Sequence, residues 1–162
     1  MSDSTRDDKR RLVSVIFDKE SLGDATEEQD NERAIAIYDL VQDNVFHLSG
    51  RDDGPYALTL AIHHAKLAFD VRLADGSPAA AHLLSLTPFR ATLRDYFATC
   101  ETYFASIRMA TPEQIEAIDE MRRQIHNDGA TLLIDRLKGK IEMDFDTARR
   151  LFTVITALRW KG

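Results

Sequence analysis

The hydrophobic positions in the first half of the chain change their period from one segment to the next. A run rich in β-branched residues between Leu12 and Phe17 predicts a strand. From about residue 29 to residue 45, apolar residues recur every three or four positions, which predicts a helix. The members of this stripe are Ala34, Ile37, Tyr38, Val41 and Val45. Residues 56–63 and 67–73 alternate apolar with polar side chains and predict an antiparallel hairpin, and AAAHLLSLT predicts a third strand beside it.

The second half of the chain has the pattern of helices. From Thr87 onward one broad apolar face is made by Phe89, Leu93, Tyr96, Phe97, Cys100, Phe104 and Ile107. Thr111 and Gln114 have the spacing of a capping box, so a second helix is predicted to begin at Pro112. A last helix is predicted to begin near Asp144. Its apolar residues fall on more than one side: Leu151, Phe152, Val154, Ile155, Ala157 and Leu158.

This order of elements predicts the fold class. A strand, a helix and a three-strand meander followed by helices is typical of an α+β fold, with an antiparallel sheet covered by a C-terminal layer of three to four helices. The polar residues 1–10 are expected to be a disordered tail, and residues 11–162 are expected to form a single α+β domain.

Composition and charge narrow the classes of function. The net charge of −6 argues against general nucleic-acid binding, which needs a concentrated basic face. Arginine makes up 15 of the 21 basic residues, however, and its planar donors suit a local carboxylate or phosphate site. A single cysteine and the lack of an apolar leader or span predict a cytoplasmic protein with no membrane partner.

Recognisable catalytic and metal motifs do not account for this chain. Its scattered glycines form neither a dinucleotide-binding nor a P-loop fingerprint. One cysteine cannot make a thiolate zinc site, and the histidines at 47, 63 and 82 lie on separate elements, so no metal and no cofactor is expected. Cys100 lies on an apolar helix face, where it is expected to pack as a small hydrophobic residue.

The candidate chemistry lies in the stretch RRQIHNDG, residues 122–129. Asp119, Arg122 or Arg123, and His126 recur at spacings of three and four, so they would share one side of a helix. Such a row could hold an anion, or His126 could act as a base oriented by Asp119 or Asp128.

The same stretch also has the composition of a helix end. Asn127, Asp128 and Gly129 are common where one helix stops and another begins, because glycine accepts positive φ there. We favour this joint over a site. If the helix continues instead, the polar row needs a partner. Arg149 and Arg150 are candidates, although we expect Asp144 and Asp146 to neutralise them.

Several stretches in one order carry a family resemblance, which covers about residues 11 to 160. They are ERAIAIYDL, SLTPFR, DYF, TPEQIEAID, RRQIHNDG and DFDTARRLF. Together they resemble the uncharacterised alphaproteobacterial protein family number 0262 of the UPF series. The resemblance implies an alphaproteobacterial cytosolic protein, and it brings no activity, cofactor or catalytic residue.

Three hypotheses of function follow from the sequence. The first is a non-enzymatic interaction or regulatory domain that forms homo-oligomers or binds a protein partner, because the last helix is apolar on more than one side. The alternative is an enzyme or anionic-ligand binder. Its candidate catalytic residues are His126, Asp119 and Asp128, and its candidate ligand-binding residues are Arg122, Arg123, Asn127, Arg149 and Arg150. RNA binding by the arginine-rich helical half is a further alternative.

Overall fold

The computed structural model describes residues 8–160 and confirms an α+β fold with a mostly antiparallel sheet. The sheet has the order β1-β3-β4-β5, formed by Leu12–Phe17, Tyr56–His63, Lys66–Leu73 and Pro78–Ser85. The meander β3-β4-β5 is antiparallel as predicted, and β1 adds to its edge in parallel with β3. That parallel pair is possible because a helix connects β1 to the meander and reverses the chain direction.

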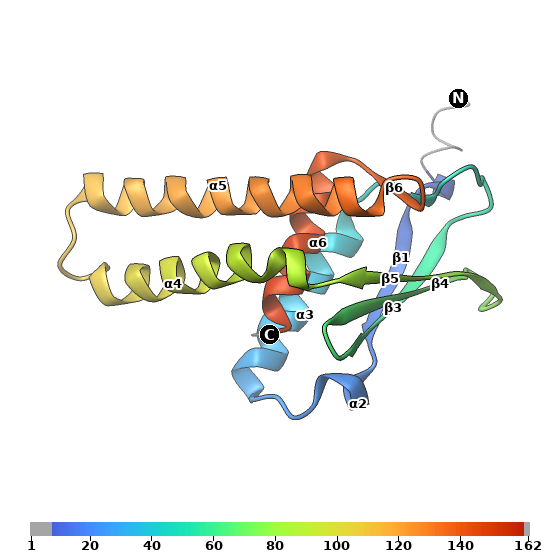
Figure 1. Ribbon diagram of the computed structural model, residues 1–162, viewed down its shortest axis with the longest axis horizontal. Coiled ribbons are helices and arrows are strands. Elements are labelled where there is room, and N and C mark those ends of the chain that lie inside the picture. Colours follow the sequence, from blue (N-terminus) through green and yellow to red (C-terminus); the bar gives the residue numbers. More distant parts are fainter. Residues whose placement is uncertain (1–7, 161–162) are drawn as a thin grey trace.

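Helices pack beside the sheet (Figure 1). They are α2 (Lys19–Leu22), α3 (Glu27–Gln42), the 3₁₀ helix η1 (Thr87–Phe89), α4 (Arg90–Ser106), α5 (Pro112–Leu137) and α6 (Phe145–Ala157). The predicted capping box of α5 is confirmed by reciprocal bonds between Thr111 and Gln114. No helix in the described range 8–160 is long and apolar enough to cross a membrane.

Two short strands were not predicted from the sequence. Strand β2 (Phe46–Leu48) pairs with β6 (Ile141–Met143) as a separate antiparallel ladder that ties the end of α5 to the first half of the chain. The described residues also include the end of the expected tail. Residues 1–7 lie outside the described residues, but the Arg10 carbonyl accepts a hydrogen bond of 2.8 Å from the Phe46 amide. The ordered fold therefore begins before residue 11.

Helix α6 is the centre of the helical layer. It packs against α3 and α5, and its residues Val154, Ile155 and Ala157 are all buried within the same chain. The apolar residues on several sides of this helix therefore belong to the protein's own core. This observation removes the argument for self-association that the sequence pattern offered.

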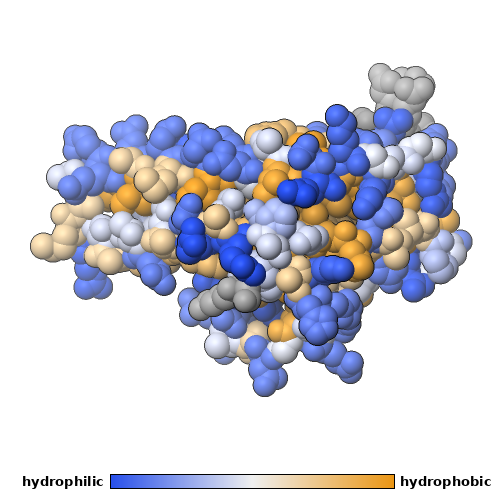
Figure 2. All heavy atoms as spheres, viewed as in Figure 1, coloured by the Kyte–Doolittle hydropathy of each residue, from blue (hydrophilic) through white to orange (hydrophobic). Residues whose placement is uncertain are grey.

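Helices α4 and α5 form a hairpin whose free end projects away from the rest of the molecule (Figure 1). Phe89 and Leu93, at the base of the hairpin, are fully buried, whereas Phe104 is 75% exposed and Ile107 is 46% exposed. Apolar residues also show at this free end in the space-filling view (Figure 2). The predicted apolar face of α4 is thus well covered over its first half and largely exposed near its end.

The buried face of α3 also differs from the predicted stripe. Tyr38 is exposed, and the buried residues are Arg33, Ala36 and Leu40. Arg33 is buried because its guanidinium donates to the carbonyls of Ala157 and Leu158 at the end of α6, at 3.1 and 3.4 Å. A cation at a helix C-terminus satisfies carbonyls that have no partner within the helix.

Helix α5 runs without interruption through the HNDG stretch, so the joint favoured from the sequence is wrong. Gly129 is buried inside the helix and does not adopt positive φ. A Cβ atom at this position would lie 2.3 Å from the Phe152 ring. Gly129 is therefore required by the close approach of α5 to α6 and not by a helix end.

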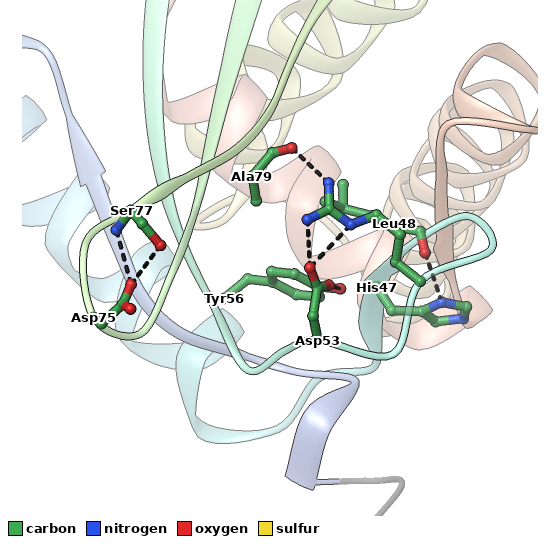
Figure 3. Close-up of polar contacts among 8 residues, drawn as sticks. His47, Leu48, Asp53, Tyr56, Asp75, Ser77 and Ala79 are labelled. Carbon is green, nitrogen blue, oxygen red and sulfur yellow. Dashed lines mark hydrogen bonds and ion pairs between the residues drawn. The ribbon is translucent and has the colours of Figure 1, made fainter.

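A polar cluster fastens the loop between β2 and β3 (Figure 3). The buried Tyr56 hydroxyl donates to Asp53 Oδ1 at 2.7 Å, and the Arg51 guanidinium donates to Asp53 Oδ2 and to the Ala79 carbonyl. The hydrogen bond from Arg51, followed by that from Tyr56, holds the pKa of Asp53 below its usual value. Burial, reinforced by Asp53, raises the pKa of Tyr56 to about 12. These charges are paired, so the cluster is a structural lock.

Candidate functional site: an arginine-lined groove between two helices

Helices α5 and α6 carry matching polar stripes. DEMRRQIH, residues 119–126, and DTARRLFT, residues 146–153, share the spacing Asp-x-x-Arg-Arg-x-x followed by His or Thr. Residues at i, i+3, i+4 and i+7 lie on one side of a helix, so each stripe faces one way. The two stripes face each other across a groove of about 410 Å³. Its lining comprises Asp119, Arg122, Arg123, His126, Asp146, Arg149, Arg150 and Thr153.

The last members of the two stripes meet in the groove. His126 Nε2 lies 3.2 Å from Thr153 Oγ1, and His126 Nδ1 lies 3.1 Å from the Arg122 carbonyl. Because a carbonyl only accepts, Nδ1 carries the proton, and Nε2 of the neutral ring accepts from the Thr153 hydroxyl. That hydroxyl also lies 3.1 Å from the Arg149 carbonyl. Each last residue thus reaches the carbonyl of the first arginine in its own stripe, which gives the groove an approximate twofold pattern.

His126 is held in its neutral form. Its ring packs edge to face against Tyr96 at 5.2 Å and Phe152 at 5.5 Å between centroids. This burial is the main reason that the pKa of His126 is lowered, and the positive charges of Arg149 and Arg122 lower it further, against the opposing effect of the bond to the Arg122 carbonyl. A negative charge in the groove would offset the two arginines and raise this pKa.

The first arginine of each stripe keeps unused hydrogen-bonding capacity. The Nε atoms of Arg122 and Arg149 are buried, and in the part of the chain that the structure describes they have no hydrogen-bond partner. Arg122 reaches Asp119 only at 3.6 Å, and its guanidinium lies 5.5 Å from the centre of the Tyr103 ring. The side chain of Arg149 makes no hydrogen bond or ion pair within residues 8–160. Buried donors without partners are uncommon in folded proteins and call for an explanation.

The second arginine of each stripe is already paired outside the groove. Arg123 bonds Glu120 at 2.8 Å. Arg150 donates to the Asp43 carbonyl at 3.0 Å and lies 3.7 Å from the Asp43 carboxylate. The expected neutralisation of Arg149 and Arg150 by Asp144 and Asp146 is therefore wrong, since Arg150 pairs with Asp43 and neither aspartate forms an ion pair with Arg149 or Arg150.

Asp144 and Asp146 do not pair with the arginines of α6. Asp144 caps α6 by accepting from the Thr147 amide at 2.9 Å, and this bond directs its carboxylate to the helix end. Asp146 lines the groove, but it forms no ion pair with either arginine of its stripe. Within residues 8–160, the groove therefore contains two arginines whose side chains donate no hydrogen bond, Arg122 and Arg149, and Arg122 also lies 3.6 Å from the Asp119 carboxylate.

Two candidate residues lie apart from the groove, and two members were missed. Asn127 does not line it, and Asp128 is exposed and accepts a hydrogen bond from Gln124 at 3.0 Å. Asp146 and Thr153 were not candidates from the sequence. The repeated Asp-x-x-Arg-Arg spacing was the available signal, because it places all four α6 residues on one face. Within the described chain, no group of three or more His, Cys, Asp or Glu side chains could hold a metal ion.

The fold and groove define an α+β protein with an arginine-lined helical groove. The chain belongs to the uncharacterised protein family UPF0262, whose family model matches residues 9–161. It is 52% identical to a UPF0262 protein of Rhodopseudomonas palustris strain BisB5, with 100% of both chains covered. It is also 51% identical to a UPF0262 protein of Nitrobacter winogradskyi, over 98% of this chain and 95% of the relative. No solved structure gives a significant match to the chain.

Proposed function

We propose that this protein binds a small oxyanion, such as a phosphate or carboxylate group, in the groove between α5 and α6. The observation that carries the proposal is the pair of buried Nε donors on Arg122 and Arg149, which have no hydrogen-bond partner among the described residues 8–160. An oxyanion between the two guanidinium groups would supply acceptors and balance their charge. Arginine suits this task because its planar fork of N–H donors matches carboxylate and phosphate oxygens.

The pairing of the two neighbouring arginines, Arg123 and Arg150, supports this proposal. Arg123 and Arg150 follow Arg122 and Arg149 directly, and each donates a hydrogen bond to a partner outside the groove, whereas the buried Nε of Arg122 and that of Arg149 have none within residues 8–160. The two neighbouring arginines on each helix therefore differ in whether their guanidinium donors are hydrogen-bonded, although Arg122 also lies 3.6 Å from the Asp119 carboxylate. The Thr153 hydroxyl adds a neutral group that can donate its one proton to an anion when it turns away from His126 Nε2 and from the Arg149 carbonyl.

The environment of His126 supports binding over catalysis. Both of its ring nitrogens are engaged, one with the Arg122 carbonyl and the other with Thr153. A general base takes a proton from a group within hydrogen-bond reach, and the group within reach of Nε2 is the Thr153 hydroxyl, whose proton has a second acceptor in the Arg149 carbonyl. Asp128, the second candidate base, points to Gln124 outside the groove. We therefore propose that His126 stays neutral, lines the groove and orients the Thr153 hydroxyl.

Thermal melts with inorganic phosphate test the proposal. Arg122→Gln and Arg149→Gln should each remove most of the phosphate-dependent rise in Tm, whereas Arg123→Gln and Arg150→Gln, one residue further along each helix, should keep it. A ligand at ten times its Kd stabilises the folded state by about 1.4 kcal/mol, enough to shift Tm by a few degrees. An equal rise in all four variants and the wild type would mean that phosphate acts on the surface in general and would refute the site.

Self-association is a second candidate function, now supported by a different surface. Phe104 and Ile107 are exposed near the free end of the α4–α5 hairpin, and Met109 follows in the connecting loop. Neighbouring exposed apolar residues favour contact with another protein surface, including a second copy of this chain. The single cysteine favours a reducing compartment, so we infer that the protein acts in the cytoplasm.

Light scattering over a range of micromolar concentrations tests self-association. A mass above that of one chain, returning to one chain in Phe104→Ser and Ile107→Ser, is the expected result. A strict monomer at all concentrations would rule this candidate out without affecting the anion site.

A further inference from the structure

A second and larger hollow adjoins the arginine-lined groove. It lies between α3 and the α4–α5 hairpin and has a volume of about 620 Å³. We call it the aromatic groove, because its lining includes Tyr96, Phe97, Tyr103 and Phe104. Ile35 of α3 lines it from the opposite helix and is 63% exposed.

Arg122 joins the two hollows. Its side chain lines both the arginine-lined groove and the aromatic groove, and its guanidinium lies over the Tyr103 ring. Tyr96 makes a second connection, since it lines the aromatic groove and packs against His126. A molecule whose anionic group meets Arg122 can therefore continue along aromatic side chains.

The remaining cation of the aromatic groove is already neutralised. Arg159 forms an ion pair of 2.8 Å with Glu32 and lies 5.5 Å from the centre of the Phe97 ring. The groove thus offers one cation with spare capacity, Arg122, at its junction with the arginine-lined groove. Beyond that cation, aromatic rings and Ile35 are the principal apolar contacts for a ligand.

We propose that the ligand is an amphipathic oxyanion, with its head between Arg122 and Arg149 and an apolar tail in the aromatic groove. This inference rests on the proposed function, because the head occupies the same anion site. Arg122 attracts the negatively charged head, and the aromatic side chains favour an apolar tail. Alkyl phosphates and alkyl carboxylates share this chemistry, and the two heads are separate arms of the test.

Calorimetric titration with methyl, butyl and octyl phosphate tests for the tail. Each buried methylene group strengthens binding by up to about fourfold, so an open groove should give roughly two- to fourfold per methylene. Octyl phosphate must be kept below the concentration at which it self-associates. Octanoate gives the carboxylate arm, and octanol, which has the tail without the charge, should bind far more weakly than either.

Two exposed residues of the groove provide variants that leave the core intact. Phe104→Ser combined with Ile35→Ser should flatten the dependence on chain length and leave methyl phosphate binding unchanged. The matched control combines Met109→Ser with Tyr38→Ser, which remove exposed apolar side chains from the same hairpin and from α3 without touching the groove. This control should keep the full dependence on chain length.

The outcomes separate the tail from the head. Methyl and octyl phosphate binding with equal affinity would overturn the aromatic groove as a tail site and leave the anion site standing. Equal losses in the groove variant and the control would overturn it as well. If neither the phosphates nor octanoate binds, the proposed function fails and this inference fails with it.

Discussion

Two arginine clusters in this molecule differ in how completely their donors are used. In the lock between β2 and β3, Arg51 meets the Asp53 carboxylate and the Ala79 carbonyl, and Asp53 also accepts from Tyr56. In the groove between α5 and α6, Arg122 and Arg149 each keep a buried donor without a partner. A closed network stabilises the fold, whereas an open one costs free energy until something else supplies acceptors.

The difference shows why arginine content alone does not identify a binding site. Both clusters combine arginine with aspartate and an aromatic neighbour, so their compositions are alike. They differ in geometry, because Asp53 faces Arg51 directly while Asp146 forms no ion pair with Arg149. Unused donors next to an open groove are what the proposed anion site requires. Saturated donors at a loop indicate a structural role.

The largest change in the free energy of unfolding should come from filling the space between α5 and α6. In Gly129→Ala the new Cβ would overlap the Phe152 ring, and overpacking of this kind should lower the free energy of unfolding by about 2–3 kcal/mol. Chemical denaturation measures the loss. The double variant Gly129→Ala with Phe152→Leu should lose less than the sum of the two single variants, and strict additivity would show that the close approach is not the cause.

Removing one bond from the lock should have a smaller effect. Tyr56→Phe deletes the buried hydroxyl but leaves Asp53 bonded to Arg51, so the free energy of unfolding should fall by about 1 kcal/mol. Urea denaturation with and without phosphate measures the change. Phosphate should raise the free energy of unfolding of Tyr56→Phe as much as that of the wild type, because the lock and the groove share no residue. A lost phosphate response would break the distinction between the two clusters.

The pH dependence of stability should distinguish the groove from the lock. The pKa of His126 is lowered in the folded state from its usual value of 6.5, so the unfolded chain takes up a proton first as pH falls. The contribution of His126 is complete above about pH 6.5 and decreases below it. His126→Gln should therefore flatten the stability curve between about pH 6.5 and 5, and phosphate should flatten it in the wild type by raising this pKa.

A second histidine provides the control for this experiment. Burial, with a contribution from Lys140, also lowers the pKa of His82. His82→Gln should flatten the curve in the same window, but it should not change how phosphate affects the remaining slope. If phosphate leaves the slope of the wild type unchanged, His126 does not sense charge in the groove.

Replacing an arginine that is already paired should have the smallest effect on phosphate affinity. Arg123 is exposed and bonded to Glu120, so Arg123→Gln should change phosphate affinity by no more than about twofold through long-range charge. Titration in low and moderate salt measures it, and added salt should reduce even this difference. A loss as large as that of Arg122→Gln would mean that the whole basic rim, and not one arginine per helix, holds the anion.

The sequence predicted much of the fold because local signals determine it. Alternation in residues 56–73 predicts the hairpin, and the capping box at Thr111 predicts the start of α5. The parallel addition of β1 and the pairing of β2 with β6 could not be predicted in this way. These pairings join residues far apart in the chain, and three-residue strands carry no readable period.

The candidate site was predicted only in part, for two physical reasons. His126, Arg122 and Arg149 were singled out by composition, but their meeting depends on where α5 crosses α6. Gly129 was taken as a helix end because glycine is frequent there, whereas packing against Phe152 is what requires it. Burial of Arg33 was unexpected for the same reason, since the carbonyls that it caps belong to α6, more than a hundred residues away.

The free energy of unfolding of Arg149→Met, measured in urea with and without phosphate, tests the central claim most directly. Methionine keeps an apolar stem but removes a donor that has no partner, so without phosphate the variant should be as stable as the wild type or more stable. It should also lose the specific gain from phosphate, whereas Arg150→Met should keep that gain. An Arg149→Met variant that is destabilised without phosphate, yet gains as much from phosphate as the wild type, would contradict an anion site in this groove.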